Sequence, residues 1–242
     1  MNASRNRKWL LLAGSIIAIA VVGAMVWYLL PAQHPNGPAP RPVADYYPTN
    51  GWRTSTAEEQ GFDSAKLAEM LRALDKGGVP VNSVLVVRNG YVVLDAYFTP
   101  YDGSFPHELA SVTKSITATL IGIAIDQGKL KLDQPMISFF PDRTIANLDA
   151  RKSQVTVGDL VSMRNGMDSQ CLNGDLPTLD AMRVSSDWMQ AALDRKMVAN
   201  PGERWCYDSP GMHILSGILQ KATGMTELEY ARQNLFEPLG IT

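Results

Sequence analysis

Cysteine, histidine and charged residues are all scarce in this chain. It has two cysteines, three histidines and 19% charged residues among its 242 positions. Two cysteines are too few for a scaffold built on disulfides, and no CxxC pair or Cys/His cluster has the spacing of a zinc site. The formal net charge of −2 gives no sign of a general nucleic-acid binder. A hydrophobic share of 45% is ordinary for a globular protein and excludes a disordered or collagen-like chain.

A large share of the apolar residues lies in one block near the N-terminus. Residues 9–30 read WLLLAGSIIAIAVVGAMVWYLL and carry no charge. A helix of this length, at about 1.5 Å per residue, spans roughly 33 Å, enough to cross a bilayer core of about 30 Å. The tail 1–8 is basic and the next charge after the block is Arg41, so the positive-inside rule predicts a cytoplasmic N-terminus. We therefore expect a single-pass signal-anchor in the inner (cytoplasmic) membrane, with the rest of the chain in the periplasm or outside.

Two other interpretations of this block stay open. A cleaved signal peptide would have a shorter apolar core of about 7–15 residues and a small-residue cleavage site. The bulky Trp27 and Tyr28 at the end of the block are not the small residues that such a site requires. A buried core helix would need a polar face, which the block lacks.

Proline is dense directly after the block. Residues 31–42 hold five prolines in twelve positions, which favours an extended, semi-rigid spacer over a folded element. Residues 43–242 then form the remaining domain. They carry 18 basic against 24 acidic side chains, a net charge of −6, because residues 1–42 contain four basic and no acidic residues. That charge argues against a domain that binds anionic lipid by itself.

Hydrophobic periodicity predicts an α/β (α+β) domain with more helices than strands. The strongest strand signal is Asn89-Gly90 between two β-branched runs, which predicts an antiparallel hairpin of strands 83–88 and 91–98. A helix beginning near Ser111 is apolar around most of its circumference, so we expect it in the core. Capping, glycine and proline signals predict further helices after Asp63-Ser64, from Thr156 toward Asn165-Gly166, from Pro210 or Gly211 to Thr223, and from Glu227 to Phe236.

Ser111 and Lys114 form a Ser-x-x-Lys pair at the start of the buried helix. Residues three apart share one face of a helix, so the lysine amine can approach the serine hydroxyl. A serine hydroxyl is a weak nucleophile at neutral pH and needs a base beside it, which a lysine in apolar surroundings can supply. The helix N-terminus would favour an oxyanion on the attacked carbonyl. Chance alone gives about one such pair in a chain of this length, so the context of the pair must decide.

The segment HELASVTKSITATLIGIAIDQGKLKLDQPM around this pair closely resembles the nucleophile helix of the serine β-lactamase and penicillin-binding protein superfamily. The nearest branch holds class C β-lactamases, related esterases and 6-aminohexanoate-oligomer hydrolases. Four further segments resemble that family in the same order, namely VLVVRNGYVVLDAYF, VTVGDLVSMRNGMD, PGERWCYDSPGMHILSGILQKATGM and LFEPLGIT. The resemblance runs from about Trp52 to Thr242. It implies a β-lactamase/transpeptidase-like fold, in which helices pack on an antiparallel sheet, and Ser111 as the nucleophile.

The resemblance also covers the family's Tyr-x-Asn motif, whose tyrosine relays protons between nucleophile, lysine and leaving group. The match is Tyr207-Asp208-Ser209, which implies that Tyr207 is catalytic together with Ser111 and Lys114. Ser209 departs from the motif because a hydroxyl lacks the two donors of an amide. This weakens the case for penicillin-like substrates and suits an esterase or amide hydrolase better. We expect Ser209 at the substrate and Asp208 as a candidate contact for a cationic substrate; a core tyrosine before a helix is the alternative for Tyr207.

The family's third motif, Lys-Thr-Gly or His-x-Gly on an edge strand, is absent from the sequence. The tetrapeptide 221–224, Lys-Ala-Thr-Gly, is superficially similar but belongs to a helix end. Only the N-terminal hairpin of the family's sheet is predicted, and a two-stranded hairpin alone makes a poor sheet. We therefore expect a family member whose C-terminal part is missing, with its remaining strands and second oxyanion-hole donor.

Cys171 and Cys206, the only cysteines, flank candidate site segments. A periplasmic location would allow a disulfide between them, which would tie the loop after Asp168 to the Tyr207 segment. Two unpaired thiols are the alternative. None of the histidines has a carboxylate partner in a triad-like context, which disfavours Ser-His-Asp catalysis, and we expect His213 to be packed polar surface.

The sequence thus predicts a membrane-anchored, extracytoplasmic serine hydrolase that cleaves a small-molecule ester, amide or β-lactam through an acyl-enzyme on Ser111. No metal or organic cofactor is implied. Nucleic acid is not an expected partner, the membrane contact is made by residues 9–30, and no protein partner can be inferred. The rival interpretation, which the missing third motif favours, is a non-catalytic penicillin-recognising or sensing module or an inactive truncated family member. A plain anchored structural domain is the third.

Overall fold

The computed structural model describes residues 46–48, 50–78 and 80–241. The chain divides into two compact units, 1–46 and 47–242. Nearly all of the described residues belong to the second unit, so the fold below is the fold of that unit alone.

The predicted N-terminal segments lie outside the described residues. These are the basic tail 1–8, the membrane anchor 9–30 and the proline-rich linker 31–42. Within the part of the chain that the structure describes, no helix is both long and apolar enough to cross a membrane.

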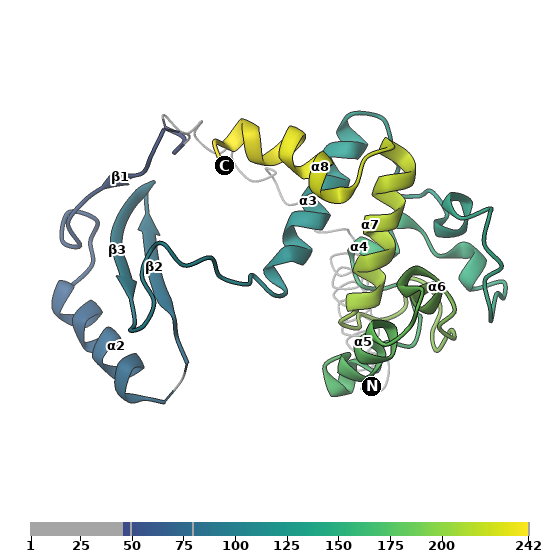
Figure 1. The fold of residues 1–242 in the computed structure, drawn as a ribbon, viewed down its shortest axis with the longest axis horizontal. Coiled ribbons are helices and arrows are strands. Elements are labelled where there is room, and N and C mark those ends of the chain that lie inside the picture. Colours follow the sequence, from purple (N-terminus) through teal and green to yellow (C-terminus); the bar gives the residue numbers. More distant parts are fainter. Residues whose placement is uncertain (1–45, 49, 79, 242) are drawn as a thin grey trace, which may run out of the picture. The chain divides into compact units, whose positions relative to one another are not determined.

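Three strands form one small mixed sheet, labelled in Figure 1. β2 (Ser83–Arg88) and β3 (Tyr91–Tyr97) pair antiparallel, and β1 (Arg53–Thr54) runs parallel to β3, giving the order β1-β3-β2. The predicted hairpin is confirmed, and its turn residues Asn89 and Gly90 have φ of 52° and 80°, as a tight hairpin turn requires. The expectation of a purely antiparallel sheet was wrong, because β1 adds a parallel edge. A strand of two residues has no periodicity that sequence reasoning could detect.

Helix α2 (Ser64–Lys76) begins and ends where the capping signals predict. The carboxylate of Asp63 accepts hydrogen bonds from the backbone N–H groups of Ala65 and Lys66, and Gly77 forms the C-cap. This cap satisfies donors that a helix start leaves without intrahelical partners. The helix has no buried residue, and the strand side chains are half-buried or exposed.

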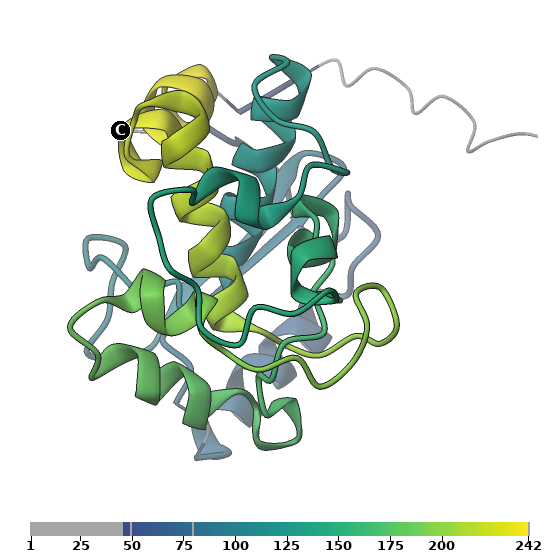
Figure 2. The ribbon, with the colours of Figure 1, turned by 90° about the vertical axis from the view of Figure 1, so that its right-hand side faces the viewer.

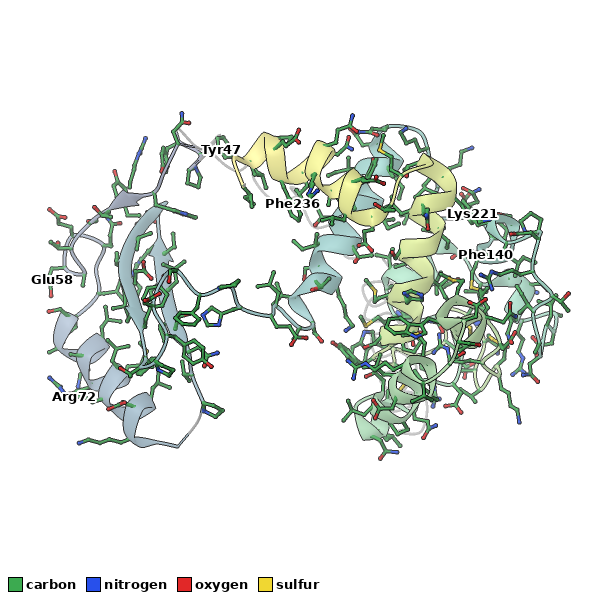
Figure 3. All side chains as sticks on the ribbon, viewed as in Figure 1. Tyr47, Glu58, Arg72, Phe140, Lys221 and Phe236 are labelled. Atoms are coloured by element: carbon green, nitrogen blue, oxygen red, sulfur yellow. A yellow bond between two sulfur atoms is a disulfide. The ribbon has the colours of Figure 1, made fainter. Side chains whose placement is uncertain are left out.

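The hydrophobic core lies in the helical part of the described chain, from α3 onward. Its centre consists of α3 (Val112–Asp126) and α7 (Ser209–Thr223), which pack against each other (Figures 1 and 2). Phe140, labelled in Figure 3, packs into the same core. The expectation that the helix after Ser111 is a core helix is therefore confirmed. The fully buried side chains of the two helices include Leu120, Ile121, Ile214, Leu215, Ile218 and Leu219.

Shorter elements surround this pair. The last predicted helix is present in two parts, because α8 (Glu227–Ala231) passes into a π-helical turn over Arg232–Phe236. The helix predicted from Thr156 is α4 (Val157–Val161), which ends earlier than expected. α5 (Leu176–Arg183), α6 (Trp188–Leu193) and the 3-10 turns Met136–Phe139, Lys152–Gln154, Cys171–Asn173 and Glu237–Leu239 complete the described elements.

One lysine side chain is completely buried in this helical part. Lys152 is 0% exposed, and its Nζ donates to the carbonyl oxygens of Ala146 at 2.8 Å and Leu193 at 3.0 Å. Burial lowers the pKa of this amine below its ordinary value. Through these two hydrogen bonds Lys152 connects the segment around Ala146 to the C-terminal end of α6.

Candidate active site

Ser111 stands at the N-terminal end of α3, where the chain enters the helix through an unusual residue. Ala110 has φ of 45°, in the left-handed region that an L side chain rarely adopts. Ser111 is the N-cap residue, yet its hydroxyl makes no capping hydrogen bond to the helix. The hydroxyl is therefore not engaged in capping, and the first backbone N–H groups of the helix point toward the same end.

Lys114 lies one helical turn after Ser111, as the spacing predicts. Its Nζ donates a hydrogen bond to Ser111 Oγ at 3.1 Å. The lysine is half-buried and the serine is exposed. A base within hydrogen-bond reach of an accessible hydroxyl is the arrangement that activates a serine nucleophile.

Tyr207 comes from a distant segment and meets the same lysine. Lys114 Nζ lies 4.9 Å from the centroid of the Tyr207 ring. The tyrosine directly precedes Asp208, the N-cap of α7, and α7 packs on α3. The structure thus brings together all three side chains that the resemblance implied as catalytic. The ring of Trp205 is a further neighbour, with its centroid 6.3 Å from that of Tyr207.

Asp208 occupies a different setting from the one expected. Its carboxylate receives two hydrogen bonds from Arg195, at 2.6 and 3.1 Å, and one from Asn165 Nδ2 at 2.7 Å. The Asp208 side chain is 2% exposed. The expectation that it could contact a cationic substrate was wrong, because the carboxylate is buried and already paired. Sequence reasoning missed Arg195 and Asn165, since both lie in irregular segments far from Tyr207 in the chain.

Ser209 begins α7 and is half-buried. Its backbone N–H donates to Asp175 Oδ2 at 2.5 Å, and Asp175 is itself buried, at the start of α5. The backbone of Ser209 is therefore held by the carboxylate of Asp175 at the start of α5.

The two cysteines are joined. Cys171 and Cys206 form a disulfide that closes a sequence separation of 35 residues, one of the two alternatives that the sequence left open. Cys206 directly precedes Tyr207, and Cys171 begins the 3-10 turn after Gln170. The bond fixes the loop before α5 to the segment that carries the tyrosine.

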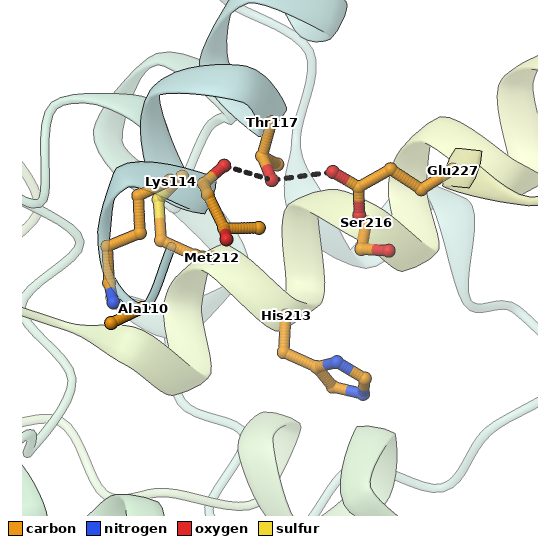
Figure 4. A pocket seen from close by; sticks show the side chains of 8 residues that line it. Ala110, Lys114, Thr117, Met212, His213, Ser216 and Glu227 are labelled. Atoms are coloured by element: carbon orange, nitrogen blue, oxygen red, sulfur yellow. Dashed lines mark hydrogen bonds between the residues drawn. The ribbon is translucent and has the colours of Figure 1, made fainter. Parts of the chain in front are cut away.

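A cavity of about 210 Å³ opens between α3 and α7 beside Lys114 (Figure 4). Thr117 Oγ1 donates to Glu227 Oε1 at 2.5 Å across it. His213 also lines it and packs edge-on against Trp188, with ring centroids 5.9 Å apart. Burial lowers the pKa of His213, while the charges of Glu227 and Asp187 oppose that shift.

His213 is half-buried and packs against Trp188, which agrees with the expectation of a packed polar residue, and it lines the cavity in addition. Sequence reasoning missed Thr117 and Glu227 altogether. The capping box that starts α8 marks the chain near Glu227, but nothing in it indicates that α8 returns to α3. The remaining lining residues are Ala110, Thr113, Met212 and Ser216.

The fold thus carries a Ser-x-x-Lys pair with a tyrosine ring beside the lysine. The model of the family described as β-lactamase matches residues 67–242. The chain therefore belongs to the β-lactamase family.

Individual relatives agree with that assignment. Over 177 residues the chain is 25% identical to protein flp of Staphylococcus aureus, covering 70% of this chain and 35% of flp. The octameric penicillin-binding protein homologue from Pyrococcus abyssi is 27% identical, with a TM-score of 0.58 over 74% of this chain and 43% of that one. EstCE1, a hydrolase with promiscuous acyltransferase activity, shares the fold at 21% identity, with a TM-score of 0.59 over 76% of this chain and 52% of its own. The chain spans about a third of the length of the curated relatives it matches.

Proposed function

We propose that residues 43–242 form a serine hydrolase domain that cleaves an ester or amide through an acyl-enzyme on Ser111. The observation that carries the proposal is the position of Lys114. Its Nζ is 3.1 Å from Ser111 Oγ and 4.9 Å from the centre of the Tyr207 ring. One amine therefore donates a hydrogen bond to the proposed nucleophile and also lies over the ring of the tyrosine.

In the acylation step Ser111 Oγ attacks the substrate carbonyl carbon while its proton passes to Lys114 Nζ. The resulting oxyanion lies at the N-terminus of α3, where the backbone N–H of Ser111 donates to it and the helix dipole stabilises it. Collapse of the tetrahedral intermediate breaks the bond to the leaving group. Tyr207 gives the leaving oxygen or nitrogen its proton and regains one from Lys114. Water then attacks the acyl-enzyme and releases the acid and free Ser111.

The substrate class follows from the chemistry of the acyl-enzyme and the second motif. An ester or a linear amide fits the proposal, and a β-lactam is a further candidate. Ser209 offers one hydroxyl where the family motif has an amide with two donors, which favours the ester or linear amide.

We also propose that residues 9–30 anchor this domain in the inner membrane and that the domain lies in the periplasm or outside. The charge-free apolar block after a basic tail supports the anchor, and the Cys171–Cys206 disulfide is typical of an oxidising compartment. Protease treatment of intact and broken cells tests this. Cleavage of the domain only after the inner membrane is broken would contradict it.

Hydrolysis of a p-nitrophenyl ester by the purified full chain tests the catalytic proposal. We expect turnover that falls to background in Ser111→Ala and by about 100-fold or more in Lys114→Met. Lys66→Met is the control, because Lys66 forms only an exposed ion pair with Glu69 on α2. Equal turnover by Ser111→Ala and the unaltered chain would refute the assignment of Ser111.

The second candidate is a non-catalytic penicillin-recognising or sensing module, which the 27% identity to the penicillin-binding protein homologue from Pyrococcus abyssi favours. A fluorescent penicillin separates the two. Persistent labelling of Ser111 without hydrolysis of the ester supports the sensing module, whereas hydrolysis of the ester supports the enzyme.

A further inference from the structure

Tyr207 is followed and preceded by residues that are each fixed from another part of the chain. Cys206 before it, Asp208 after it and Ser209 beyond that are each bonded to a side chain that lies far away in sequence. The tyrosine side chain itself contacts Lys114 and Trp205 through its ring. The position of its ring therefore depends on how firmly the surrounding backbone is held.

The attachment directly after Tyr207 is the ion pair between Arg195 and Asp208. It is bidentate, at 2.6 and 3.1 Å, with the side chains 9% and 2% exposed. Bidentate guanidinium–carboxylate pairs fix direction as well as distance. Asn165 Nδ2 donates to the same carboxylate at 2.7 Å. The orientation of Asp208 is therefore set by three donors from two segments.

Arg195 is in turn held by the segment that carries it. Its Nε donates to the carbonyl oxygen of Ala192 at 3.0 Å, and its Nη1 lies 3.4 Å from the carbonyl oxygen of Asp168. The guanidinium thereby connects the end of α6 and the loop after Met167 to Asp208. Gly211 completes the arrangement, because a side-chain carbon at that position would collide with the Asp208 carboxylate.

The other two attachments act on either side of this pair. Cys206 is bonded to Cys171, and its backbone N–H donates to the carbonyl oxygen of Met163 at 2.9 Å. The backbone N–H of Ser209 donates to the buried carboxylate of Asp175. The Arg195–Asp208 pair thus fixes the residue directly after Tyr207, and the bonds at Cys206 and Ser209 fix the chain on either side of it.

We propose that Arg195 is a positioning residue of the candidate active site: through its buried pair with Asp208 it holds the Tyr207 ring beside Lys114. The proposal rests on the function proposed above, in which Tyr207 transfers a proton. Arg195 touches neither Ser111 nor Lys114 in the structure's described contacts, so its effect on turnover passes through the tyrosine. Misplacing a catalytic group by about 1 Å costs on the order of 100-fold in rate.

A double-mutant cycle on kcat for a p-nitrophenyl ester tests this route. In the full chain we expect Arg195→Met to lower kcat by about 10- to 100-fold with KM changed by less than about threefold. In the Tyr207→Phe background the same change should have no further effect on kcat, because the proton-transfer group is already gone. An equal fold-loss in both backgrounds would overturn the proposal and assign Arg195 a general structural role.

Matched variants separate positioning from folding. Arg195→Met leaves a buried carboxylate without its partner, so Arg195→Met/Asp208→Asn provides a version that removes the uncompensated charge. We expect it to fold and to retain the low kcat. Arg195→Lys keeps the charge and should recover part of the loss. Arg143→Met is the control, since Arg143 also joins two segments, through Asp187 and Gln190, but does not adjoin Tyr207.

A measurement without turnover distinguishes failure of this inference from failure of the proposed function. 3-Fluorotyrosine at position 207 reports on the ring directly by ¹⁹F NMR. We expect one narrow resonance in the unaltered chain and in Arg143→Met, and a broadened or divided resonance in Arg195→Met/Asp208→Asn. An unchanged resonance in that double variant would overturn the positioning role whether or not the chain hydrolyses the ester.

Discussion

Removing the disulfide should cost this domain a large part of its stability. Cys171 and Cys206 close a loop with a sequence separation of 35 residues. Releasing a loop of that length returns chain entropy to the unfolded state worth about 4 kcal/mol at 25 °C. Cys171→Ala/Cys206→Ala should therefore unfold with a free energy about 4 kcal/mol below that of the oxidised chain. Alanine avoids placing new hydroxyls in this partly buried position.

Urea titration followed by tryptophan fluorescence measures the difference. With a slope of about 2 kcal/mol per molar urea, the midpoint should fall by about 2 M. Adding a reductant to the unaltered chain should give the same fall, and adding it to the double alanine variant should change nothing. A difference below about 1 kcal/mol, or two titratable thiols in the unreduced folded chain, would refute the reasoning from loop closure.

Three further predictions concern single side chains. Lys152→Met removes a donor from two carbonyl groups and should destabilise the domain by about 2–3 kcal/mol in urea. Burial lowers the pKa of Lys152, so the stability that this lysine contributes is complete above its ordinary pKa of 10.5 and declines as the pH falls. The difference in unfolding free energy between the unaltered chain and Lys152→Met should therefore widen from pH 7 to pH 10. His213 should titrate below 6.5 by NMR because burial lowers its pKa, and its contribution to stability should decline as the pH falls below 6.5; a midpoint above 6.5 would contradict this. Ser209→Asn, which restores two amide donors, should raise the rate of labelling by a fluorescent penicillin relative to ester turnover, and an unchanged ratio would count against the role given to Ser209.

Local signals predicted the elements whose ends are fixed by short-range chemistry. Asp63 and Gly77 delimit α2 as an N-cap and a helix stop should. Gly224, with φ of 74°, ends α7 in the left-handed conformation that glycine permits. The Asn89-Gly90 hairpin has the same character. In each case the deciding interaction lies within a few residues in the chain, so the sequence alone displays it.

Elements that depend on tertiary packing were missed. β1 has only two residues and owes its existence to pairing with β3. Helices α5 and α6 have only eight and six residues, which is too short to show a clear helical period. The π-helical turn after α8 also escapes any local rule. The positions of these elements are determined by packing with residues that are distant in the sequence.

In the candidate site, too, the contacts that depend on local spacing could be predicted and those that depend on tertiary packing could not. Ser111 and Lys114 could be paired from sequence because three residues on a helix share a face, and the structure places them 3.1 Å apart. The link to Tyr207 came from the resemblance and not from spacing. Asp208 was misjudged because its partner Arg195 lies 13 residues away across an irregular loop. A carboxylate in a sequence carries no mark of whether an arginine will bury it.

The most direct test of the account is to locate the acyl group. The full chain is mixed with p-nitrophenyl acetate, quenched in acid during turnover, digested and analysed by tandem mass spectrometry. The account predicts one acetyl group on the peptide that contains Ser111, assigned to the serine itself, and its absence in Ser111→Ala. Turnover without an acyl adduct on Ser111, or an adduct on another residue that persists in Ser111→Ala, would contradict the central claim.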